Sequence, residues 1–342
     1  MARRLNVLIG TFLEQEHVEM IASCDGSIDV LYAPELLPVP RFACDHAGVP
    51  RELTAAEQGV WESLLARADV SFDFDWQSPA ELPRRSPNLR WVQATSAGIG
   101  GFMRDTGLDH APLVATTAAG IHALPLAEFA LAGALYFAKG FPALRTWQRE
   151  HRWERYTTTL LAGRRVTVVG LGGIGREVVS LFKALRTVIT AVVRSDAEPY
   201  ANGMSRVDFR HLDDVLPTTD VLVLCCPLTP ETRGLVGPRQ LAKLPRHAVL
   251  INVARGGVVD ESALVDALTA GELGGACLDV FTAEPLPVDS PLWDMENVIV
   301  SPHSASTVAT ENAALTELFV DNLRRYLLGA PLRNVYRPER GY

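Results

Sequence analysis

Residues 166–175 read Val-Thr-Val-Val-Gly-Leu-Gly-Gly-Ile-Gly, and this stretch decides the fold. A β-branched run leads into glycines at positions 170, 172 and 175, and a helix-like segment follows over residues 176–185. A strand, a G-x-G-x-x-G turn and a helix in this order indicate a dinucleotide-binding site. The alternative is a glycine-rich turn without a ligand, and the flanking strand and helix count against it.

Each glycine of this turn has its own task in a dinucleotide site. Gly170 permits the tight turn, Gly172 lets a pyrophosphate approach the backbone, and Gly175 lets the helix pack against the strand. The helix N-terminus offers N–H groups and a positive dipole end to the phosphates. We therefore expect the turn, with Gly173 and Ile174 included, to bind the cofactor.

The residues after the next strand, 188–193, bear on which cofactor binds. An NAD site places Asp or Glu here, about 20 residues after the first glycine, to bind the ribose 2′-hydroxyl. This chain has Arg194-Ser195-Asp196 instead. A guanidinium can hold a 2′-phosphate through paired hydrogen bonds, and Ser195 adds a hydroxyl. The sequence thus favours NADP over NAD, although Asp196 leaves NAD open and Arg194 could be a solvated loop charge.

Length and composition indicate a globular protein of two domains. The chain has 342 residues and a formal charge of −8, and this charge argues against a nucleic-acid-binding protein, which would need a basic face. The five cysteines form no C-x-x-C pair, which argues against a metal site and suits a reducing compartment. The apolar stretch 124–137 is shorter than the ~20 residues of a membrane span. With no signal peptide visible, we expect a cytoplasmic protein.

Strand-like and helix-like segments alternate along the whole chain, which predicts α/β domains with mainly parallel sheets. The first part has a capping-box helix over 54–67 and a proline-rich loop over 34–50. Its expected strands are 6–9, 28–32, 70–74, 89–94 and 113–115. The second part has six expected strands, enough for a Rossmann sheet: 165–169, 188–193, 221–225, 248–253, 276–280 and 298–300.

We expect two doubly wound domains, a flavodoxin-like substrate domain and a Rossmann dinucleotide-binding domain. The dinucleotide motif lies in the middle of the chain, so the substrate domain comes first, over residues 1–121, and the Rossmann domain spans 122–306. The helix-like segment 308–328 could pack back on the first domain. Residues 307–342 would then complete it.

Three polar residues follow expected strands of the second part: Arg255, Glu284 and His303. Ligands of open α/β sheets bind beyond the carboxyl ends of the strands, so the three could share one crevice. Arginine can bind a carboxylate, histidine can exchange a proton near neutral pH, and a carboxylate beside it fixes its tautomer. Taken singly, each could equally be a strand-end charge, a turn residue or a cap. Together they suit reduction of a 2-oxo acid beside a nicotinamide.

Five ordered motifs resemble the D-isomer-specific 2-hydroxyacid dehydrogenase family, over residues 90–335. They are Val169-Gly-Leu-Gly-Gly-Ile-Gly175, Cys226-Pro-Leu-Thr-Pro-Glu-Thr232, Ile251-Asn-Val-Ala-Arg-Gly-Gly-Val-Val-Asp-Glu261, Leu278-Asp-Val-Phe-Thr-Ala-Glu-Pro-Leu-Pro287 and Ser301-Pro-His303. The resemblance implies that Arg255 binds the substrate carboxylate and carbonyl, that His303 is the general acid/base, and that Glu284 is its partner.

The resemblance also implies further contacts. Asp279 would contact the nicotinamide carboxamide, and Ser96-Ala97-Gly98-Ile99 would hold the substrate carboxylate through backbone N–H groups. The cofactor contacts would include Cys226, Pro227, Thr232, Val253 and Ala254. Trp76 resembles a pocket tryptophan of glyoxylate/hydroxypyruvate reductases, although a core or surface aromatic is an equal alternative.

The sequence therefore predicts an NADPH-dependent reductase of glyoxylate, hydroxypyruvate or a related 2-oxo acid. The family usually carries Asp near position 194, and Arg194-Ser195 resembles the NADPH-preferring reductases instead. One alternative is an NAD-dependent phosphoglycerate-type dehydrogenase. Another is a dinucleotide-sensing, corepressor-like binding protein. We expect a homodimer that acts on a small molecule, with no membrane, nucleic-acid or metal partner.

Overall fold

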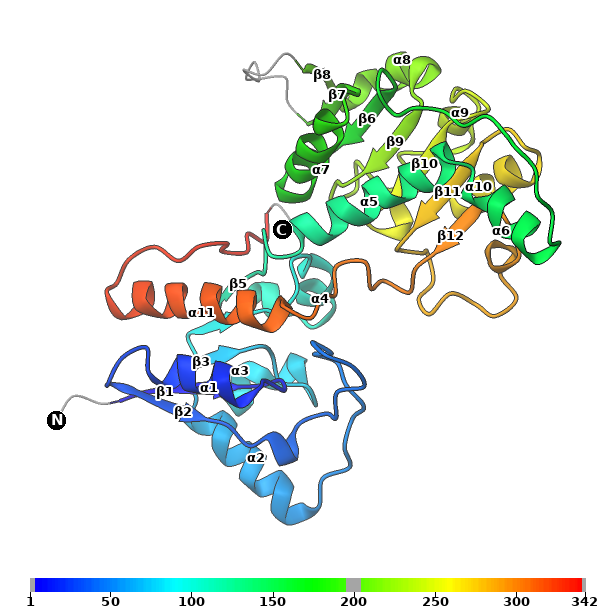
Figure 1. Cartoon of the computed structure of the whole chain (residues 1–342). Coiled ribbons are helices and arrows are strands. Elements are labelled where there is room, and N and C mark those ends of the chain that lie inside the picture. Colours follow the sequence, from blue (N-terminus) through cyan, green and yellow to red (C-terminus); the bar gives the residue numbers. More distant parts are fainter. Residues whose placement is uncertain (1–3, 195–203, 340–342) are drawn as a thin grey trace. The chain divides into compact units, whose positions relative to one another are not determined.

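The computed structural model describes residues 4–194 and 204–339, and the chain divides into two compact units (Figure 1). Unit 1 comprises residues 1–121 and 307–342, and unit 2 comprises residues 122–306. Each unit is built on its own parallel β-sheet with helices. The predicted fold class, two parallel-sheet α/β domains, is confirmed.

Unit 1 has a five-stranded sheet in the order β2-β1-β3-β4-β5, which is the flavodoxin-like order. Its strands are β1 (Leu5–Ile9), β2 (Ile28–Leu31), β3 (Val70–Phe72), β4 (Trp91–Gln93) and β5 (Val114–Thr116). Its helices are α1 (Gln15–Ala22), α2 (Ala55–Arg67), α3 (Leu82–Arg85), α4 (Gly100–Asp105) and α11 (Glu311–Leu327). The capping box expected at Thr54 and Glu57 begins α2.

Helix α11 supplies part of the core of unit 1, although nearly two hundred residues separate it from β5. Its Phe319 ring lies 5.1 Å from the ring of Phe72 on β3 and 5.2 Å from that of Trp91 on β4, measured between centroids. All three side chains are fully buried. The apolar face of α11 is therefore an integral layer of this sheet's core.

In its described residues, unit 2 has seven parallel strands in the order β12-β11-β10-β9-β6-β7-β8. Numbered from β6, the sheet reads 3-2-1-4-5-6 with one further strand, the order of a Rossmann sheet. The strands are β6 (Arg165–Val169), β7 (Val188–Val193), β8 (Ser205–Asp208), β9 (Val221–Leu224), β10 (Val249–Asn252), β11 (Gly275–Leu278) and β12 (Val298–Val300). The helices are α5 (Ala123–Ala138), α6 (Phe141–Arg149), α7 (Gly173–Ala184), α8 (Leu212–Val215), α9 (Pro238–Leu241) and α10 (Glu261–Thr269).

Several expected strands end earlier in the structure than in the prediction, and one strand was not predicted at all. The second part was expected to have six strands, but β8 adds a seventh at the sheet edge. Its sequence, Ser-Arg-Val-Asp, lacks the apolar run of a central strand because one side of an edge strand has no neighbour. Strand β3 was expected to reach residue 74, but it ends at Phe72 because Asp73 has a left-handed backbone with φ of +68°.

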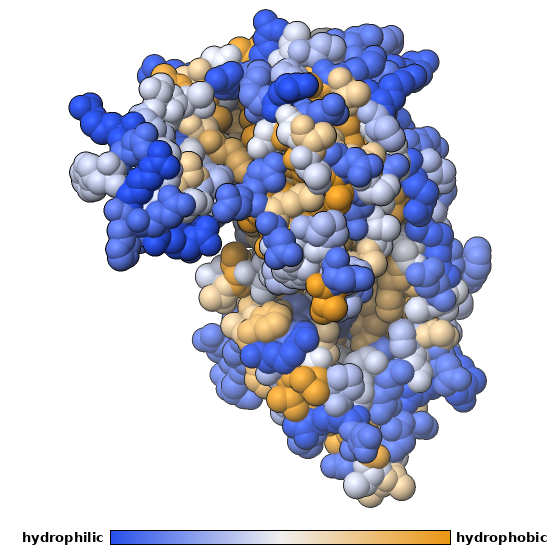
Figure 2. All heavy atoms as spheres, turned by 90° about the vertical axis from the view of Figure 1, so that its right-hand side faces the viewer, coloured by the Kyte–Doolittle hydropathy of each residue, from blue (hydrophilic) through white to orange (hydrophobic). Residues whose placement is uncertain are grey.

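Helix α5 packs closely against the sheet of unit 2. Ala127, Ala130 and Ala134 are buried, and a Cβ atom at Gly133 would lie 2.7 Å from the sulfur of Cys277 on β11. This apolar helix is thus a core element. Within the described ranges, we find no helix with the length and apolar character needed to span a membrane. Hydrophobic side chains on the face shown in Figure 2 occur in small groups among hydrophilic ones.

Candidate active site

The three predicted catalytic residues follow three neighbouring strands of unit 2. Arg255 comes shortly after β10, Glu284 after β11 and His303 after β12, and these strands pair in parallel as β10-β11-β12. Their carboxyl ends therefore meet at one edge of the sheet, where ligands of doubly wound folds bind.

His303 and Glu284 form a direct pair. The Nδ1 atom of His303 lies 2.8 Å from Oε2 of Glu284, and both side chains are partly exposed. The other carboxylate oxygen, Oε1, accepts the backbone N–H of Phe281 at 2.9 Å. An ionised carboxylate accepts hydrogen bonds only, so Nδ1 carries a proton and Nε2 is left to face a reacting group.

The loop that carries His303 is held by one buried carboxylate. Oδ1 of Asp279 accepts hydrogen bonds from Ser301 Oγ at 2.6 Å, Ser304 N at 2.9 Å and Ala305 N at 3.0 Å. His303 itself has a left-handed backbone with φ of +54°. Such strain persists where the surroundings hold it, and here the bonds to Asp279 do so on both sides of His303. Burial raises the pKa of Asp279, against the opposing effect of these bonds and of His303.

Arg255 is half-buried on the loop after β10. Its Nη1 donates to the carbonyl of Ala254 at 2.7 Å. Burial lowers the pKa of Arg255, while the nearby charges of Glu284 and Asp279 act in the opposite direction. Arg255 therefore lies within electrostatic range of the His303–Glu284 pair.

Three residues that support this site were not among the predicted ones. The buried side chain of Asn252 braces the Arg255 loop, since Nδ2 donates to the carbonyl of Arg255 at 3.2 Å and Oδ1 accepts from Ala254 N at 3.0 Å. Glu261 holds the Glu284 loop, because its Oε2 accepts from Thr282 N at 2.8 Å. A Cβ atom at Gly256 would lie 1.9 Å from the carbonyl carbon of Phe281, so this position requires glycine. All three lie within the motif 251–261, which was the available signal.

The three glycines of the dinucleotide turn have different surroundings. Gly170 has φ of +95°, and a Cβ atom there would lie 2.9 Å from the backbone of Cys226. A Cβ atom at Gly175 would lie 2.0 Å from the carbonyl oxygen of Gly170. Around Gly172 there is open space, and the first turn of α7, which begins with Gly173 and Ile174, has no side-chain cap. The turn therefore offers backbone N–H groups to an anion.

The other predicted cofactor contacts also belong to unit 2. Arg194 follows β7 and is exposed, whereas Ser195 and Asp196 lie outside the described residues. The charge of Arg194 contributes to the lowered pKa of Glu231, after the larger effect of the hydrogen bond from Thr229. The side chains of Cys226, Val253 and Ala254 are buried, so any contact of these residues with a cofactor would be made by their backbone atoms. Thr232 Oγ1 donates to the carbonyl of Pro227 at 2.6 Å, which closes the 227–232 loop.

The remaining candidates, Trp76 and residues 96–99, belong to unit 1. Ser96 and Gly98 are exposed, while Ile99 is buried in the core. The carbonyl of Ser96 accepts from Ala118 N at 3.1 Å. Trp76 is half-buried against that core, and its Nε1 has no hydrogen-bond partner in the structure.

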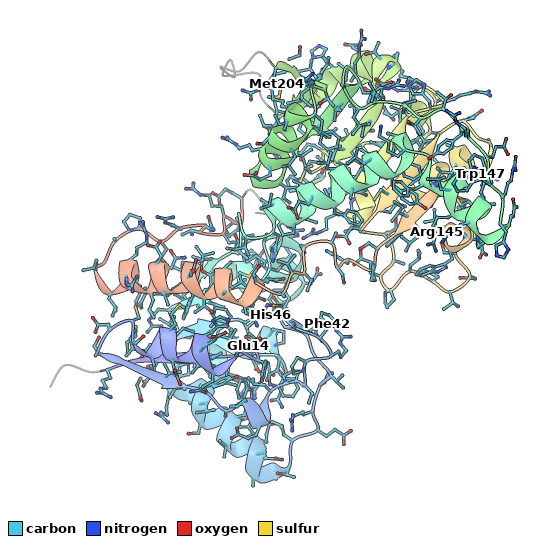
Figure 3. The ribbon with its side chains drawn as sticks, viewed as in Figure 1. Glu14, Phe42, His46, Arg145, Trp147 and Met204 are labelled. Atoms are coloured by element: carbon cyan, nitrogen blue, oxygen red, sulfur yellow. The ribbon has the colours of Figure 1, made fainter. Side chains whose placement is uncertain are left out.

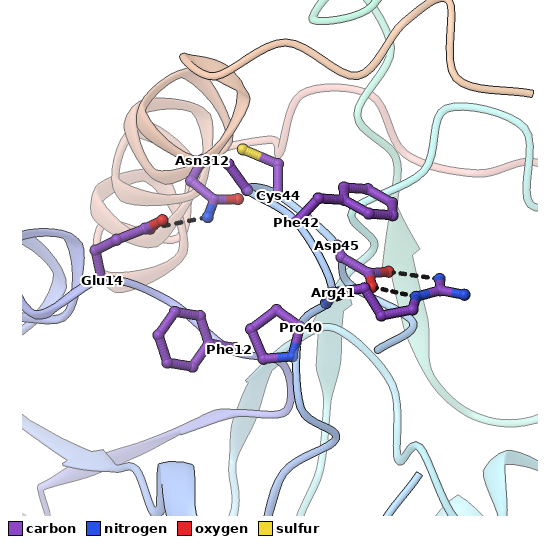
Figure 4. A pocket seen from close by; sticks show the side chains of 9 residues that line it. Phe12, Glu14, Pro40, Arg41, Phe42, Cys44, Asp45 and Asn312 are labelled. Carbon is purple, nitrogen blue, oxygen red and sulfur yellow. Dashed lines mark hydrogen bonds and ion pairs between the residues drawn. The ribbon is translucent and has the colours of Figure 1, made fainter. Parts of the chain in front are cut away.

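A separate cavity of about 240 Å³ lies in unit 1, beside the proline-rich loop (Figure 4). Its lining residues are Phe12, Glu14, Pro40, Arg41, Phe42, Ala43, Cys44, Asp45 and Asn312. Glu14 accepts a hydrogen bond of 2.8 Å from Asn312 across one wall, and Asp45 binds Arg41 on the other. None of the predicted site residues that the structure describes lines this cavity.

Comparison with known proteins bears directly on this arrangement. Residues 131–305 match the family model "D-isomer specific 2-hydroxyacid dehydrogenase, NAD binding domain". The chain belongs to the D-isomer specific 2-hydroxyacid dehydrogenase family. The family resemblance seen in the sequence is thereby confirmed.

The relatives of this chain include a phosphoglycerate dehydrogenase and a glyoxylate/hydroxypyruvate reductase. The chain is 34% identical over 290 residues to a D-3-phosphoglycerate dehydrogenase of Mycobacterium tuberculosis, covering 82% of this chain and 52% of the relative. It thus spans about half the length of that protein. It is 39% identical over 324 residues to glyoxylate/hydroxypyruvate reductase B of Pectobacterium atrosepticum, covering 90% of this chain and 98% of the relative.

A solved structure is similar over the whole chain. It is a D-isomer specific 2-hydroxyacid dehydrogenase from Xanthobacter autotrophicus Py2, in complex with NADPH and MES. The two share 32% identity and a TM-score of 0.78, with full coverage of both chains. The likeness therefore includes unit 1, which lies wholly outside the residues that the family model matches.

Proposed function

We propose that this chain reduces small 2-oxo acids to D-2-hydroxy acids with NADPH. The observation that supports this most is the His303–Glu284 pair of 2.8 Å, with Arg255 in electrostatic range, at the carboxyl edge of a Rossmann sheet. An acid, its anionic partner and a cation together provide what reduction of a 2-oxo acid requires. The handedness of the product follows from the family.

In this mechanism each protein group has one task. Arg255 binds the substrate carboxylate and polarises the neighbouring carbonyl, since its planar fork matches a carboxylate. Protonated His303 gives the Nε2 proton to the carbonyl oxygen, while Glu284 stabilises the imidazolium through Nδ1. The nicotinamide, when bound, supplies the hydride to the carbonyl carbon. Asp279 holds the His303 loop and, as the family resemblance implies, would contact the nicotinamide carboxamide.

The dinucleotide turn fits this cofactor. Open space at Gly172 and the uncapped first turn of α7 leave room and N–H groups for a pyrophosphate. Arg194, exposed after β7, supports NADP over NAD because a guanidinium binds a 2′-phosphate. The similar Xanthobacter protein was solved with NADPH. NAD remains the second candidate.

Glyoxylate, hydroxypyruvate or a close relative is the proposed substrate. Residues 96–99 of unit 1 would bind its carboxylate through backbone N–H groups, and Trp76 would contact its other end. The name of the 39% identical Pectobacterium relative supports this choice. The phosphoglycerate dehydrogenase names support the alternative, and a sensing role would need a site that binds the dinucleotide without turnover.

We also propose that the chain forms a homodimer through residues 141–160 of unit 2. This segment exposes several large apolar side chains, with Trp153 98% exposed and Leu160 69% exposed. Contiguous exposed apolar groups mark interaction surfaces. Size-exclusion chromatography with light scattering tests this, and a monomer at micromolar concentration would contradict it. The free cysteines are consistent with a cytoplasmic location.

The decisive experiment is a turnover panel. Glyoxylate, hydroxypyruvate, pyruvate and 3-phosphohydroxypyruvate are each tested with NADPH and with NADH. We expect the highest kcat/KM for an unphosphorylated acid with NADPH. A preference for the phosphorylated acid with NADH would favour the phosphoglycerate-type alternative. Cofactor binding without turnover of any acid would favour the sensor.

A further inference from the structure

Asp73 is a strained residue at the carboxyl end of β3 in unit 1. Its φ of +68° is uncommon for a residue with a side chain, although Asp tolerates it better than most. The backbone is held on both sides, because Ser71 Oγ donates to the carbonyl of Asp73 at 2.6 Å and Asp73 N donates to the carbonyl of Gln93 at 2.8 Å. Strained residues held in this way cluster at functional sites.

The carboxylate of Asp73 joins two loops. Its Oδ2 accepts from Thr95 Oγ1 at 2.9 Å, and its Oδ1 accepts from Phe74 N at 3.0 Å. Thr95 directly precedes residues 96–99, and Phe74 begins the segment that leads to Trp76. One buried carboxylate therefore ties together both unit 1 segments to which the proposed function assigns substrate contacts.

The bond to Thr95 fixes the start of the 96–99 loop. The loop is also held at the carbonyl of Ser96, which accepts from Ala118 N, and at its end by the buried side chain of Ile99. The bond between Thr95 and Asp73 is therefore one of the contacts that set the direction in which the backbone enters this loop.

The charge of His46 favours the ionised form of Asp73. Burial raises the pKa of Asp73, and the charge of His46 and the bond from Thr95 act to lower it. His46 lies beside the first turn of α11 (Figure 3), with Nδ1 3.4 Å from Thr11 Oγ1 and Nε2 3.7 Å from Oε1 of Glu311. It comes from the proline-rich loop 34–50, so this loop brings a potential cation to the carboxyl edge of the sheet.

We propose that Asp73 is a positioning residue for the substrate-carboxylate loop, residues 96–99, and acts on it through Thr95. This role rests on the proposed function. Asp73 does not touch the substrate. It fixes the loop whose N–H groups bind the substrate carboxylate, so its loss weakens substrate binding more than the chemical step.

The test compares Asp73→Asn and Thr95→Val with two controls. Thr95→Ser keeps the hydroxyl, and Thr316→Val removes a buried hydroxyl of α11 that has no hydrogen-bond partner in the structure. For Asp73→Asn and Thr95→Val we expect KM for glyoxylate to rise about tenfold or more, the scale of a modest misplacement, with kcat changed less than about threefold. KM for NADPH should stay unchanged, and both controls should behave as the wild type.

Amide hydrogen exchange gives a readout that needs no turnover. In Asp73→Asn and Thr95→Val, residues 94–101 should exchange faster while unit 2 exchanges as in the wild type. Unchanged loop exchange and unchanged KM in either folded variant would overturn the role of Asp73. If the wild type reduces no 2-oxo acid, the proposed function fails, and the exchange experiment still decides whether Asp73 orders the loop.

Discussion

The backbone of Gly256 packs directly against the backbone of Phe281. A Cβ atom at Gly256 would lie 1.9 Å from the carbonyl carbon of Phe281 and 2.0 Å from its oxygen. Gly256 follows Arg255, and Phe281 N donates to Glu284. The contact therefore sets the spacing between the loop that carries Arg255 and the loop that carries Glu284.

Gly256→Ala should separate these two loops. The obstructing atoms are backbone, so they cannot turn aside, and we expect a loss of about 1–3 kcal/mol in stability. Activity toward 2-oxo acids should fall by about 10²-fold, because the acid pair and the arginine no longer share one geometry. Gly257→Ala is the matched control, since its Cβ would meet movable side-chain atoms of Leu228 at 3.3 Å. Equal kcat/KM for the two variants would contradict the expectation.

The His303–Glu284 pair predicts that substituting His303 lowers kcat more than substituting Glu284. His303→Asn removes the proton donor, and kcat for reduction should fall by about 10²–10⁴-fold. Glu284→Gln keeps a hydrogen bond to Nδ1 but removes the anion, so the fall should be smaller and should grow as pH rises. Pre-steady-state reduction at saturating NADPH measures the chemical step. An active His303→Asn variant would remove this residue from the acid role.

Arg194→Asp should reverse the cofactor preference. The carboxylate repels a 2′-phosphate and can accept a bond from a ribose hydroxyl, and losing a charged pair is worth about 1.5–3 kcal/mol. The ratio of kcat/KM for NADPH to that for NADH should drop at least tenfold. Arg246→Asp makes the same change in charge at another exposed position of unit 2. If this ratio of kcat/KM values stays constant in Arg194→Asp, the side chain of Arg194 does not bind the 2′-phosphate.

The hydrogen bonds of Asp45 predict that the stability of the fold decreases at low pH. Its carboxylate accepts from Arg41 N, Nε and Nη2 and from Gly48 N, at 2.7–3.0 Å, which holds the pKa of Asp45 well below its usual range. A lowered folded-state pKa stabilises the fold above the unfolded pKa of about 3.9, and this stabilisation is lost as pH falls below it.

Asp45→Asn should therefore destabilise the 39–49 loop at pH 7 by about 1–3 kcal/mol, with Arg41 partly exposed. The difference between the variant and the wild type should shrink steadily as pH falls below about 3.9, and it should vanish only below the lowered folded-state pKa of Asp45. Amide exchange of residues 39–49 at pH 7 and across this acidic range measures this. Asp25→Asn, on the exposed carboxylate bound to Ser27, serves as the control and should not change this loop at any of these pH values. A loss at pH 7 that persists in full at low pH would contradict the linkage.

The sequence predicted the main helices and strands and the candidate site residues, but it did not predict the residues that hold the site loops in place. The glycine spacing at 170–175 and the apolar strands of unit 2 were visible because each is a local pattern. Strand β8 was missed because an edge strand with the sequence Ser-Arg-Val-Asp has no apolar periodicity. Its existence depends on pairing with β7, which only the folded chain shows.

The supports of the candidate site were missed for a similar reason. Gly256 and Glu261 act through contacts with residues 281 and 282, which are more than twenty positions away in the chain. Asp73 was not singled out because its role depends on a left-handed backbone and on Thr95, which follows β4. Such tertiary contacts leave little trace in local sequence patterns.

The return of the chain to unit 1 has a consequence for synthesis on the ribosome. Phe72 and Trp91 emerge early, but Phe319, which packs between them, emerges only after all of unit 2. Until then the nascent sheet of unit 1 exposes the apolar face that α11 later covers. Unit 2 is continuous in sequence and can close its own core first. During translation, the part of the chain that is made first is therefore the part that finishes folding last, and chaperones would find their binding site there.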